Sequence, residues 1–210
     1  MKKIIAKLTG KTSFKGSGSY WNERYSAGGN SGRGSYGHLA TYKAAFLNSF
    51  VKQHQIKTVI EFGSGDGNQL TLAEYPFYTG LDVSPVAIQK CIALFKTDNT
   101  KSFFLYDSLA FADKQHFFKA DLSLSLDVIY HLVEDEIYQT YMDQLFAAAS
   151  KFVIIYAWDV AGNDKVHVKH RKFSSLIQER YPLWELMAIN PGLEKLPDAC
   201  DFFVYRRIEK

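Results

Sequence analysis

Apolar residues in this chain occur in two patterns, short continuous runs and stripes that recur every three or four positions. The runs predict β-strands, and the stripes predict amphipathic helices. The expected strands are 57–62, 78–82, 102–106, 120–126, 151–156, 184–189 and 201–206. The expected helices are 39–53, a short one through Leu70 and Leu72, 85–95, 133–145 and 173–181.

The order of these elements predicts the fold class. Strands and helices alternate up to the fifth strand, 151–156 (KFVIIY), which is apolar throughout, as is usual for a parallel strand covered on both faces. The last two strands, 184–189 and 201–206, have no helix-length segment between them, which indicates an antiparallel pair at one edge. We therefore predict an α/β fold built on a doubly wound, mostly parallel sheet.

The chain before the first predicted helix has a different composition. Seven of the chain's fourteen glycines fall between Gly16 and Gly37, together with many serines. Such a composition is typical of a flexible linker, but four aromatic residues within it are not. They are Tyr20, Trp21, Tyr25 and Tyr36. We expect residues 1–38 to form a mobile flap with aromatic contacts and residues 39–210 to form the main domain.

Charge and cysteine content argue against several classes of protein. The formal charge of +3 gives no ground for a nucleic-acid partner, which needs basic residues concentrated on one face. Cys91 and Cys200 fit no metal or redox spacing, so we expect small buried core residues and a reducing compartment. Lys7 interrupts the apolar residues that follow the basic start, and no apolar run is long enough to span a bilayer. We therefore expect a soluble, cytoplasmic protein with no membrane contact.

The segment 61–68 (EFGSGDGN) places three glycines at alternate positions directly after the first strand. Glycine permits a left-handed backbone, and the first strand–helix turn of a doubly wound sheet is a favoured ligand cradle. The third glycine comes four residues after the first, whereas the dinucleotide motif G-x-G-x-x-G places it five after. Glu61 would repel a pyrophosphate and suit a positively charged ligand. Asp82, about twenty positions on, could bind the ribose of any adenosine ligand.

Three segments in this order resemble the successive motifs of class I S-adenosylmethionine-dependent methyltransferases. They are 61–67 (EFGSGDG), 80–85 (GLDVSP) and 124–132 (LSLDVIYHL). The resemblance implies a Rossmann-like fold with a seven-stranded sheet, an antiparallel last strand, and S-adenosyl-L-methionine as the cofactor. An acidic rim of Glu61, Asp82 and Asp107 would suit the cationic sulfonium of that cofactor.

The resemblance also implies which residues contact the cofactor. The loop with Gly63, Gly65 and Gly67 is expected to pass under it, and Asp82 to bind the ribose hydroxyls. Asp107 is expected near the adenine amine, with an exposed turn carboxylate as the alternative. Leu126 is expected to border the methionine part.

Methyl transfer requires the acceptor to be held near the methyl group and, for a hydroxyl acceptor, a proton to be removed. His131 follows the fourth strand, where family members use a histidine for substrate or only to cap the helix. The segment 156–172 contains Tyr156, His167, His170 and Arg171. It is either a solvated basic face or a pocket for an anionic acceptor, with Arg171 as a bidentate clamp. His167 and His170 have no third ligand nearby in the sequence, so we expect no metal site.

The segment 21–48 resembles the leading segment of a group of small bacterial methyltransferases, some of them connected with capsule or surface-polysaccharide modification. This resemblance implies that flap residues cover the cofactor and touch the acceptor, unless their rings simply pack against the domain. We expect catalytic roles for Tyr25, His131 and His170, and a cofactor contact by Tyr20. The residues expected to contact the acceptor are Arg33, Tyr36, Tyr156, His167 and Arg171.

Two other functions remain open at this point. A nicotinamide-dependent oxidoreductase is disfavoured by the glycine spacing and by Glu61, whereas a non-catalytic S-adenosylmethionine-binding protein would keep the same cofactor residues. A nucleic-acid methyltransferase would be expected to carry an Asn/Asp-Pro-Pro-aromatic element after the fourth strand, where this chain has Leu-Asp-Val-Ile-Tyr. The sequence therefore predicts methyl transfer to a small molecule, an anionic or a sugar- or nucleotide-linked metabolite, with a protein acceptor as the alternative.

Overall fold

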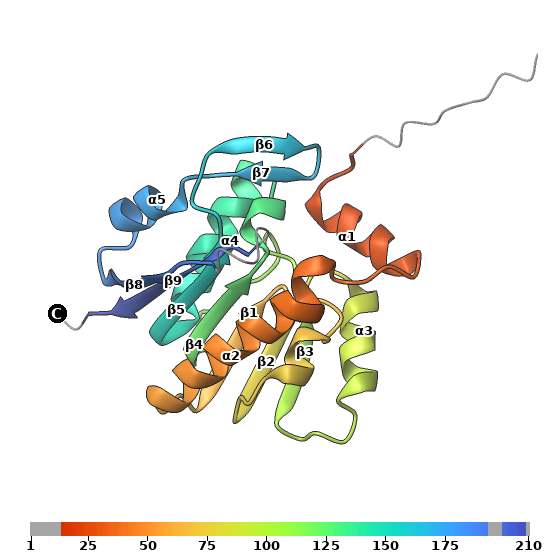
Figure 1. Ribbon diagram of the computed structural model, residues 1–210. Coiled ribbons are helices and arrows are strands. Elements are labelled where there is room, and N and C mark those ends of the chain that lie inside the picture. Colours follow the sequence, from red (N-terminus) through yellow and green to blue (C-terminus); the bar gives the residue numbers. More distant parts are fainter. Residues whose placement is uncertain (1–13, 193–198, 209–210) are drawn as a thin grey trace, which may run out of the picture.

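The computed structural model describes residues 14–192 and 199–208, and its centre is one seven-stranded sheet (Figure 1). The strand order is β3-β2-β1-β4-β5-β9-β8. The strands are β1 (Thr58–Phe62), β2 (Phe77–Asp82), β3 (Lys101–Leu105), β4 (Ala120–Leu126), β5 (Ala149–Ala157), β8 (Trp184–Asn190) and β9 (Asp201–Arg207). β1 to β5 pair in parallel, and β9 is antiparallel to both β5 and β8. The predicted doubly wound sheet with an antiparallel last strand is confirmed.

Helices cover both faces of this sheet. The helices are α1 (Ser17–Ser26), α2 (Gly37–Gln53), α3 (Pro85–Leu94), α4 (Asp135–Ala147) and α5 (Phe173–Arg180). One hydrophobic cluster packs α4 and α5 on one face, and a second packs α2 on the other. Val59 belongs to the α2 cluster and its neighbour Ile60 to the α4 cluster, because strand side chains alternate between faces. Burial on both faces explains why the central strands are apolar throughout.

The starts of α3 and α4 carry residues that stabilise a helix N-terminus. The Ser84 hydroxyl accepts a hydrogen bond from the backbone N–H of Ala87 at 3.4 Å, and Pro85 is the first residue of α3. α4 carries acidic residues in its first turn, where the helix dipole favours negative charge. Tyr141 and Leu145 of this helix are buried, whereas Val133, inside the predicted range 133–145, precedes it.

Three segments differ from the expected elements. The helix predicted through Leu70 and Leu72 is a single 3₁₀ turn, η2 (Gln69–Leu72), because Pro76 follows soon after the glycine loop and leaves little length for a helix. The flap contains the helix α1 and a 3₁₀ turn, η1 (Arg33–Ser35), and its first part, 1–13, lies outside the described residues. The segment after β5 contains a small antiparallel hairpin, β6 (Gly162–Lys165) with β7 (Val168–His170).

The two cysteines agree with a simpler expectation. Cys91 and Cys200 are both buried and form no disulfide, as expected for small core residues. In the parts of the chain described above, no helix combines the length and the apolar character that crossing a membrane requires.

Candidate functional site

The glycine loop after β1 is held tightly against its neighbours. Gly63 and Gly65 both have left-handed backbones, with φ of 88° and 60°. A Cβ added to Gly63 would lie 2.5 Å from a methyl carbon of Val128, and one added to Gly65 would lie 2.3 Å from the Ser31 hydroxyl. Both positions therefore require glycine for conformation and for close packing. The loop therefore has a fixed conformation that its neighbours constrain.

A cavity of about 280 Å³ lies beside this loop. Its walls come from the ends of β1 to β4, from the start of α4 and from the flap. The lining residues are Ser17, Gly18, Trp21, Tyr25, Ser31, Ser35, Gly63, Gly65, Asp82, Val83, Tyr106, Asp107, Ser108, Leu126, Asp127, Val128, His131, Leu132, Ile137 and Tyr141. The cavity thus spans the β1–β4 boundary, where the strand order reverses and where doubly wound sheets bind their ligands.

The charged side chains of this lining are carboxylates. They are Asp82, Asp107 and Asp127, and within the described part of the chain no lysine or arginine lines the cavity. The carboxylate of Asp82 is buried and accepts hydrogen bonds from the backbone N–H groups of Gly65 and Ser84, both at 2.9 Å. Burial raises the pKa of Asp82 to about 6, against the opposing effect of these hydrogen bonds. The cavity therefore favours a ligand that carries positive charge or hydrogen-bond donors.

Glu61, predicted on the acidic rim, is not among the residues that line the cavity. Its neighbours Ile60 and Phe62 face the α4 side, so alternation turns Glu61 to the α2 side of the sheet. There it is buried and accepts a hydrogen bond of 2.7 Å from the hydroxyl of Tyr78. Burial raises the pKa of Glu61 to about 7, although Tyr78 and the nearby Lys43 cation oppose the shift. This hydrogen bond links β1 to β2 beneath the glycine loop.

The flap is bonded to the glycine loop through Asp66. The Ser31 backbone N–H and the Tyr36 hydroxyl both donate to Oδ2 of Asp66 at 2.9 Å, and the Asp66 N–H donates to the Ser31 hydroxyl at 2.8 Å. The Tyr25 hydroxyl lies 3.0 Å from the same Ser31 oxygen. Tyr36 is thus engaged by the loop, whereas Tyr25 lines the cavity.

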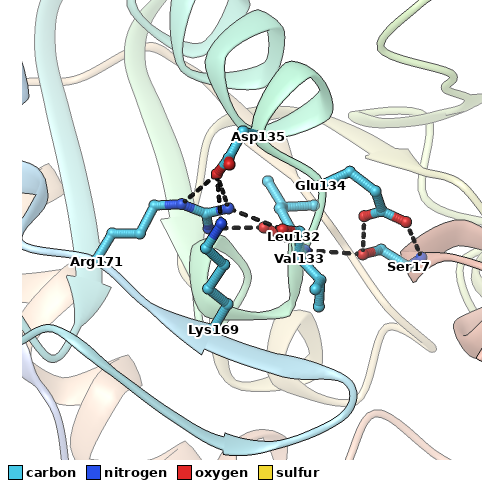
Figure 2. A network of polar contacts seen from close by, with 7 residues as sticks. All are labelled: Ser17, Leu132, Val133, Glu134, Asp135, Lys169 and Arg171. Carbon is cyan, nitrogen blue, oxygen red and sulfur yellow. Dashed lines mark hydrogen bonds and ion pairs between the residues drawn. The ribbon is translucent and has the colours of Figure 1, made fainter.

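A second connection fixes the start of α1, where Ser17 lines the cavity, through the hydrogen bonds of Ser17 (Figure 2). The Ser17 backbone N–H and hydroxyl donate to the two carboxylate oxygens of Glu134 at 2.9 and 2.5 Å, and the Val133 N–H donates to the Ser17 hydroxyl at 3.0 Å. Although partial burial opposes the shift, the hydrogen bonds from Ser17 lower the pKa of Glu134. We call the Ser17–Glu134 contact the latch. It ties α1 to the residues that precede α4.

His131 is the candidate proton acceptor in the cavity lining. Its Nδ1 lies 3.2 Å from the carbonyl oxygen of His167, and its ring meets the Trp21 ring edge-on at 4.9 Å between centroids. Burial lowers the pKa of His131 to about 4, so the imidazole is neutral at neutral pH. With Nδ1 donating to the carbonyl, Nε2 is left as an acceptor. Tyr20 stacks on the His167 ring at 4.4 Å.

Arg171, predicted as a clamp for the acceptor, is not among the residues that line the cavity, and it is bonded to the chain before α4 (Figure 2). Its guanidinium donates to the carbonyl oxygens of Leu132 and Val133 at 2.7 and 3.0 Å and to the Asp135 carboxylate at 2.7 Å. It also lies over the Tyr138 ring at 4.2 Å. The planar fork of Arg171 thus fixes the chain before α4.

The predicted site residues separate into two groups. Those that line the cavity are Tyr25, Gly63, Gly65, Asp82, Asp107, Leu126 and His131. Those that lie outside its lining are Tyr20, Arg33, Tyr36, Glu61, Gly67, Tyr156, His167, His170 and Arg171. Tyr156 is buried in the core, where its hydroxyl accepts a hydrogen bond from the Cys200 N–H at 2.9 Å.

The most informative residue that we did not predict is Asp127. It lies inside the segment 124–132 that carries the family resemblance, directly after β4. Its place at the carboxyl end of a central parallel strand is the signal that could have identified it. Ser17 had no comparable signal, because its contact with the cavity depends on the path of α1, whereas Trp21 is one of the four aromatic residues that distinguish the flap from a linker.

Solved structures with the same architecture include three methyltransferases. The methyltransferase domain of bacterial CtHen1-C matches with a TM-score of 0.67 at 20% identity, over 82% of this chain and 100% of that chain. Magnesium protoporphyrin IX methyltransferase from Synechocystis PCC 6803, solved with bound SAH, matches with a TM-score of 0.65 at 15% identity, over 90% and 97%. The N-methyltransferase NodS from Bradyrhizobium japonicum WM9, in complex with S-adenosyl-L-homocysteine, matches with a TM-score of 0.61 at 18% identity, over 80% and 86%.

No protein-family model and no curated protein matches the chain. Identities this low establish a shared fold, and a fold alone does not fix a reaction. The chain therefore has the Rossmann-like fold of these methyltransferases. The residues that line its cavity are the evidence for the reaction.

Proposed function

We propose that the protein is an S-adenosylmethionine-dependent methyltransferase that acts on a small molecule. The observation that carries the proposal is the cavity at the β1–β4 boundary. It is built on Gly63 and Gly65, and among the residues that the structure describes, the charged ones in its lining are carboxylates. A positively charged sulfonium ligand suits these charges, whereas the pyrophosphate of a nicotinamide dinucleotide would be repelled by them. The volume of about 280 Å³ is near the lower end of ligand pockets, which matches a single nucleoside ligand better than a dinucleotide.

The lining residues supply the contacts that such a ligand needs. Asp82 and Asp107 would hold its adenosine part, and Leu126 would border its methionine part. When bound, S-adenosylmethionine supplies an electrophilic methyl group. We propose that α1 and Trp21 exclude water from this group, and that the flap, residues 1–38, acts as a cover on the domain 39–210.

Two lining residues could serve the acceptor. His131 is neutral and has Nε2 available, so it would accept a hydrogen bond from an acceptor hydroxyl or amine, while its lowered pKa makes it a weak base. Burial raises the pKa of Tyr25 far above neutral pH, so its hydroxyl would act as a hydrogen-bonding group rather than as a base.

The charges of the lining also bear on the acceptor. The expectation of an anionic acceptor depended on Arg171, which is engaged by Asp135 and two carbonyl groups. We therefore favour an acceptor that is uncharged or cationic where it meets the cavity, such as the hydroxyl or amine of a sugar. The resemblance to methyltransferases of surface-polysaccharide modification supports this as a second proposal, with the cytoplasm as the place of action.

A thermal-shift experiment tests the proposed function. S-adenosylmethionine and S-adenosylhomocysteine should raise the melting temperature, since a ligand at 100 times its Kd stabilises the native state by about 2.7 kcal/mol. NAD and NADP should leave it unchanged, and an equal shift with either would refute the proposal. Methyl transfer from labelled S-adenosylmethionine to nucleotide-linked sugars then separates an enzyme from a non-catalytic binding protein.

A further inference from the structure

Residues 132–135 connect the 3₁₀ turn η3 (Ile129–His131) to α4, and two separate elements are bonded to them (Figure 2). We call these four residues the anchor. The first element is the β6–β7 hairpin, whose Lys169 donates to the Asp135 carboxylate at 2.7 Å. Arg171, directly after the hairpin, donates to the same carboxylate and to two carbonyl oxygens of the anchor. The second element is the start of α1, which is bound through the latch.

One peptide group of the anchor is bonded to both elements. Its carbonyl oxygen, on Leu132, accepts a hydrogen bond from Arg171 at 2.7 Å. Its N–H, on Val133, donates to the Ser17 hydroxyl at 3.0 Å. A trans peptide directs its C=O and N–H to opposite sides, and Figure 2 shows Arg171 and Ser17 on opposite sides of the anchor. Hydrogen bonds that share a group strengthen one another, so the loss of either bond weakens the other.

The two elements also touch each other directly. The Tyr20 ring of α1 stacks on the His167 ring of the hairpin, with centroids 4.4 Å apart and planes 13° apart. The next residue of α1, Trp21, meets the ring of His131, whose Nδ1 lies 3.2 Å from the His167 carbonyl oxygen. Movement of α1 away from the anchor therefore breaks contacts with the hairpin as well.

The start of α1 fits closely against the anchor. A Cβ on Gly16 would lie 2.9 Å from Oε1 of Glu134, and the φ of Gly16 is 113°, which L side chains rarely adopt. The same helix supplies a wall of the cavity, through Ser17, Gly18, Trp21 and Tyr25. The position of this wall thus depends on bonds that the anchor makes outside the cavity lining.

We propose that α1 and the β6–β7 hairpin form a single lid that opens from the anchor as one unit, and that Arg171 is a positioning residue that controls how fast the cofactor exchanges. This inference rests on the proposed function. Opening of the lid breaks the bonds of Arg171 as well as those of Ser17, so the loss of either favours opening. Because Arg171 lies outside the cavity lining, its bonds are the same with and without a ligand. Their loss should speed ligand binding and release by the same factor and leave the Kd unchanged.

Hydrogen exchange of the ligand-free protein tests whether the two elements open together, because amide exchange reports local opening. In Arg171→Ala, amide groups of α1 such as that of Tyr20, which donates to the Gly16 carbonyl oxygen at 3.0 Å, should exchange about tenfold faster than in the wild type. In Ser17→Ala, amide groups of the hairpin should be accelerated about as much, because coupling between two sites is reciprocal. The matched control, Arg180→Ala, removes an arginine–aspartate ion pair between α5 and α4 and should leave the exchange of both elements at the wild-type rate.

Stopped-flow fluorescence with S-adenosylhomocysteine tests the control of exchange. In Arg171→Ala, association and dissociation should both be about tenfold faster, with the Kd within about twofold of the wild-type value. Wild-type rates in this variant would overturn the inference and leave the proposed function standing.

The exchange measurements need no ligand and decide the single lid separately. Faster exchange of the hairpin alone in Arg171→Ala, or of α1 alone in Ser17→Ala, would overturn it, and so would equal acceleration by Arg180→Ala. Ser17→Ala removes one hydroxyl and decides the question if Arg171→Ala does not fold. A wild type that does not bind S-adenosylhomocysteine would refute the proposed function and, with it, the role of Arg171 in cofactor exchange.

Discussion

Gly65 is the position where the smallest change should have the largest effect. In Gly65→Ala, the new Cβ would lie 2.3 Å from the Ser31 hydroxyl and 3.2 Å from the Tyr25 hydroxyl, so the flap must move away from the loop. The backbone must also keep a φ of 60° with a side chain present. The substitution therefore strains the loop and separates it from its cover.

The expected destabilisation is the sum of two effects. A left-handed conformation costs an L-residue about 1 to 2 kcal/mol. Displacing Ser31 breaks its hydrogen bond to the Asp66 carboxylate, and bonds to charged groups contribute about 1.5 to 3 kcal/mol. We expect a loss of about 3 kcal/mol in the free energy of unfolding. In a domain of this size that lowers the melting temperature by about 6 to 12 °C.

Thermal melting and calorimetric titration with S-adenosylhomocysteine measure the two consequences, stability and affinity. Gly162→Ala is the matched control, because a Cβ at Gly162 would meet nothing within 4 Å. The control should melt within about 1 °C of the wild type, since surface substitutions change stability by less than about 0.5 kcal/mol. Wild-type stability together with wild-type affinity in Gly65→Ala would refute the packing of flap and loop described here.

Three further predictions concern the latch, Arg171 and His131. Ser17→Ala removes the hydroxyl of the latch and should speed dissociation of S-adenosylhomocysteine about tenfold in stopped-flow fluorescence. The control, Ser19→Ala, changes an exposed serine of the same helix and should leave the dissociation rate at the wild-type value. A wild-type dissociation rate in Ser17→Ala would contradict the latch. Arg171→Ala should lower the free energy of unfolding in urea by about 2 to 3 kcal/mol and leave the Kd of S-adenosylhomocysteine unchanged. Unchanged stability together with weaker ligand binding would indicate that Arg171 belongs to the binding site. The pKa of His131 is about 4 in the folded protein and about 6.5 in the unfolded chain. Between these values the unfolded chain binds more protons, so the free energy of unfolding decreases as the pH is lowered. From pH 7 to 4.5, His131→Asn should lose about 2.5 kcal/mol less than the wild type, and identical losses would count against a buried neutral imidazole.

The sheet and its ligand cradle could be predicted because local patterns determine them. The central strands read as apolar runs, Ser84 and Pro85 mark a helix start, and the glycines mark the turn after β1. The position of Asp82 at the end of β2 followed from the same alternation of strands and helices. Each of these features depends on residues that are close together in the sequence.

The other site residues depend on contacts between distant segments. Helix α1 begins between Gly16 and Gly18, and glycine in such a segment hides helical periodicity. Arg171 reads as a free cation until the fold brings it to Asp135 and the carbonyl oxygens before α4. Glu61 was placed on the rim by its position in the motif, but its register in β1 turns it toward Tyr78. Only the three-dimensional structure brings these pairs together.

A crystal structure of the protein with S-adenosylhomocysteine tests the central claim most directly. We expect density for the ligand in the cavity, with its ribose at Asp82 and its methionine part beside Leu126. Crystals grown at saturating ligand with that cavity empty, or with the ligand bound elsewhere on the molecule, would contradict the account.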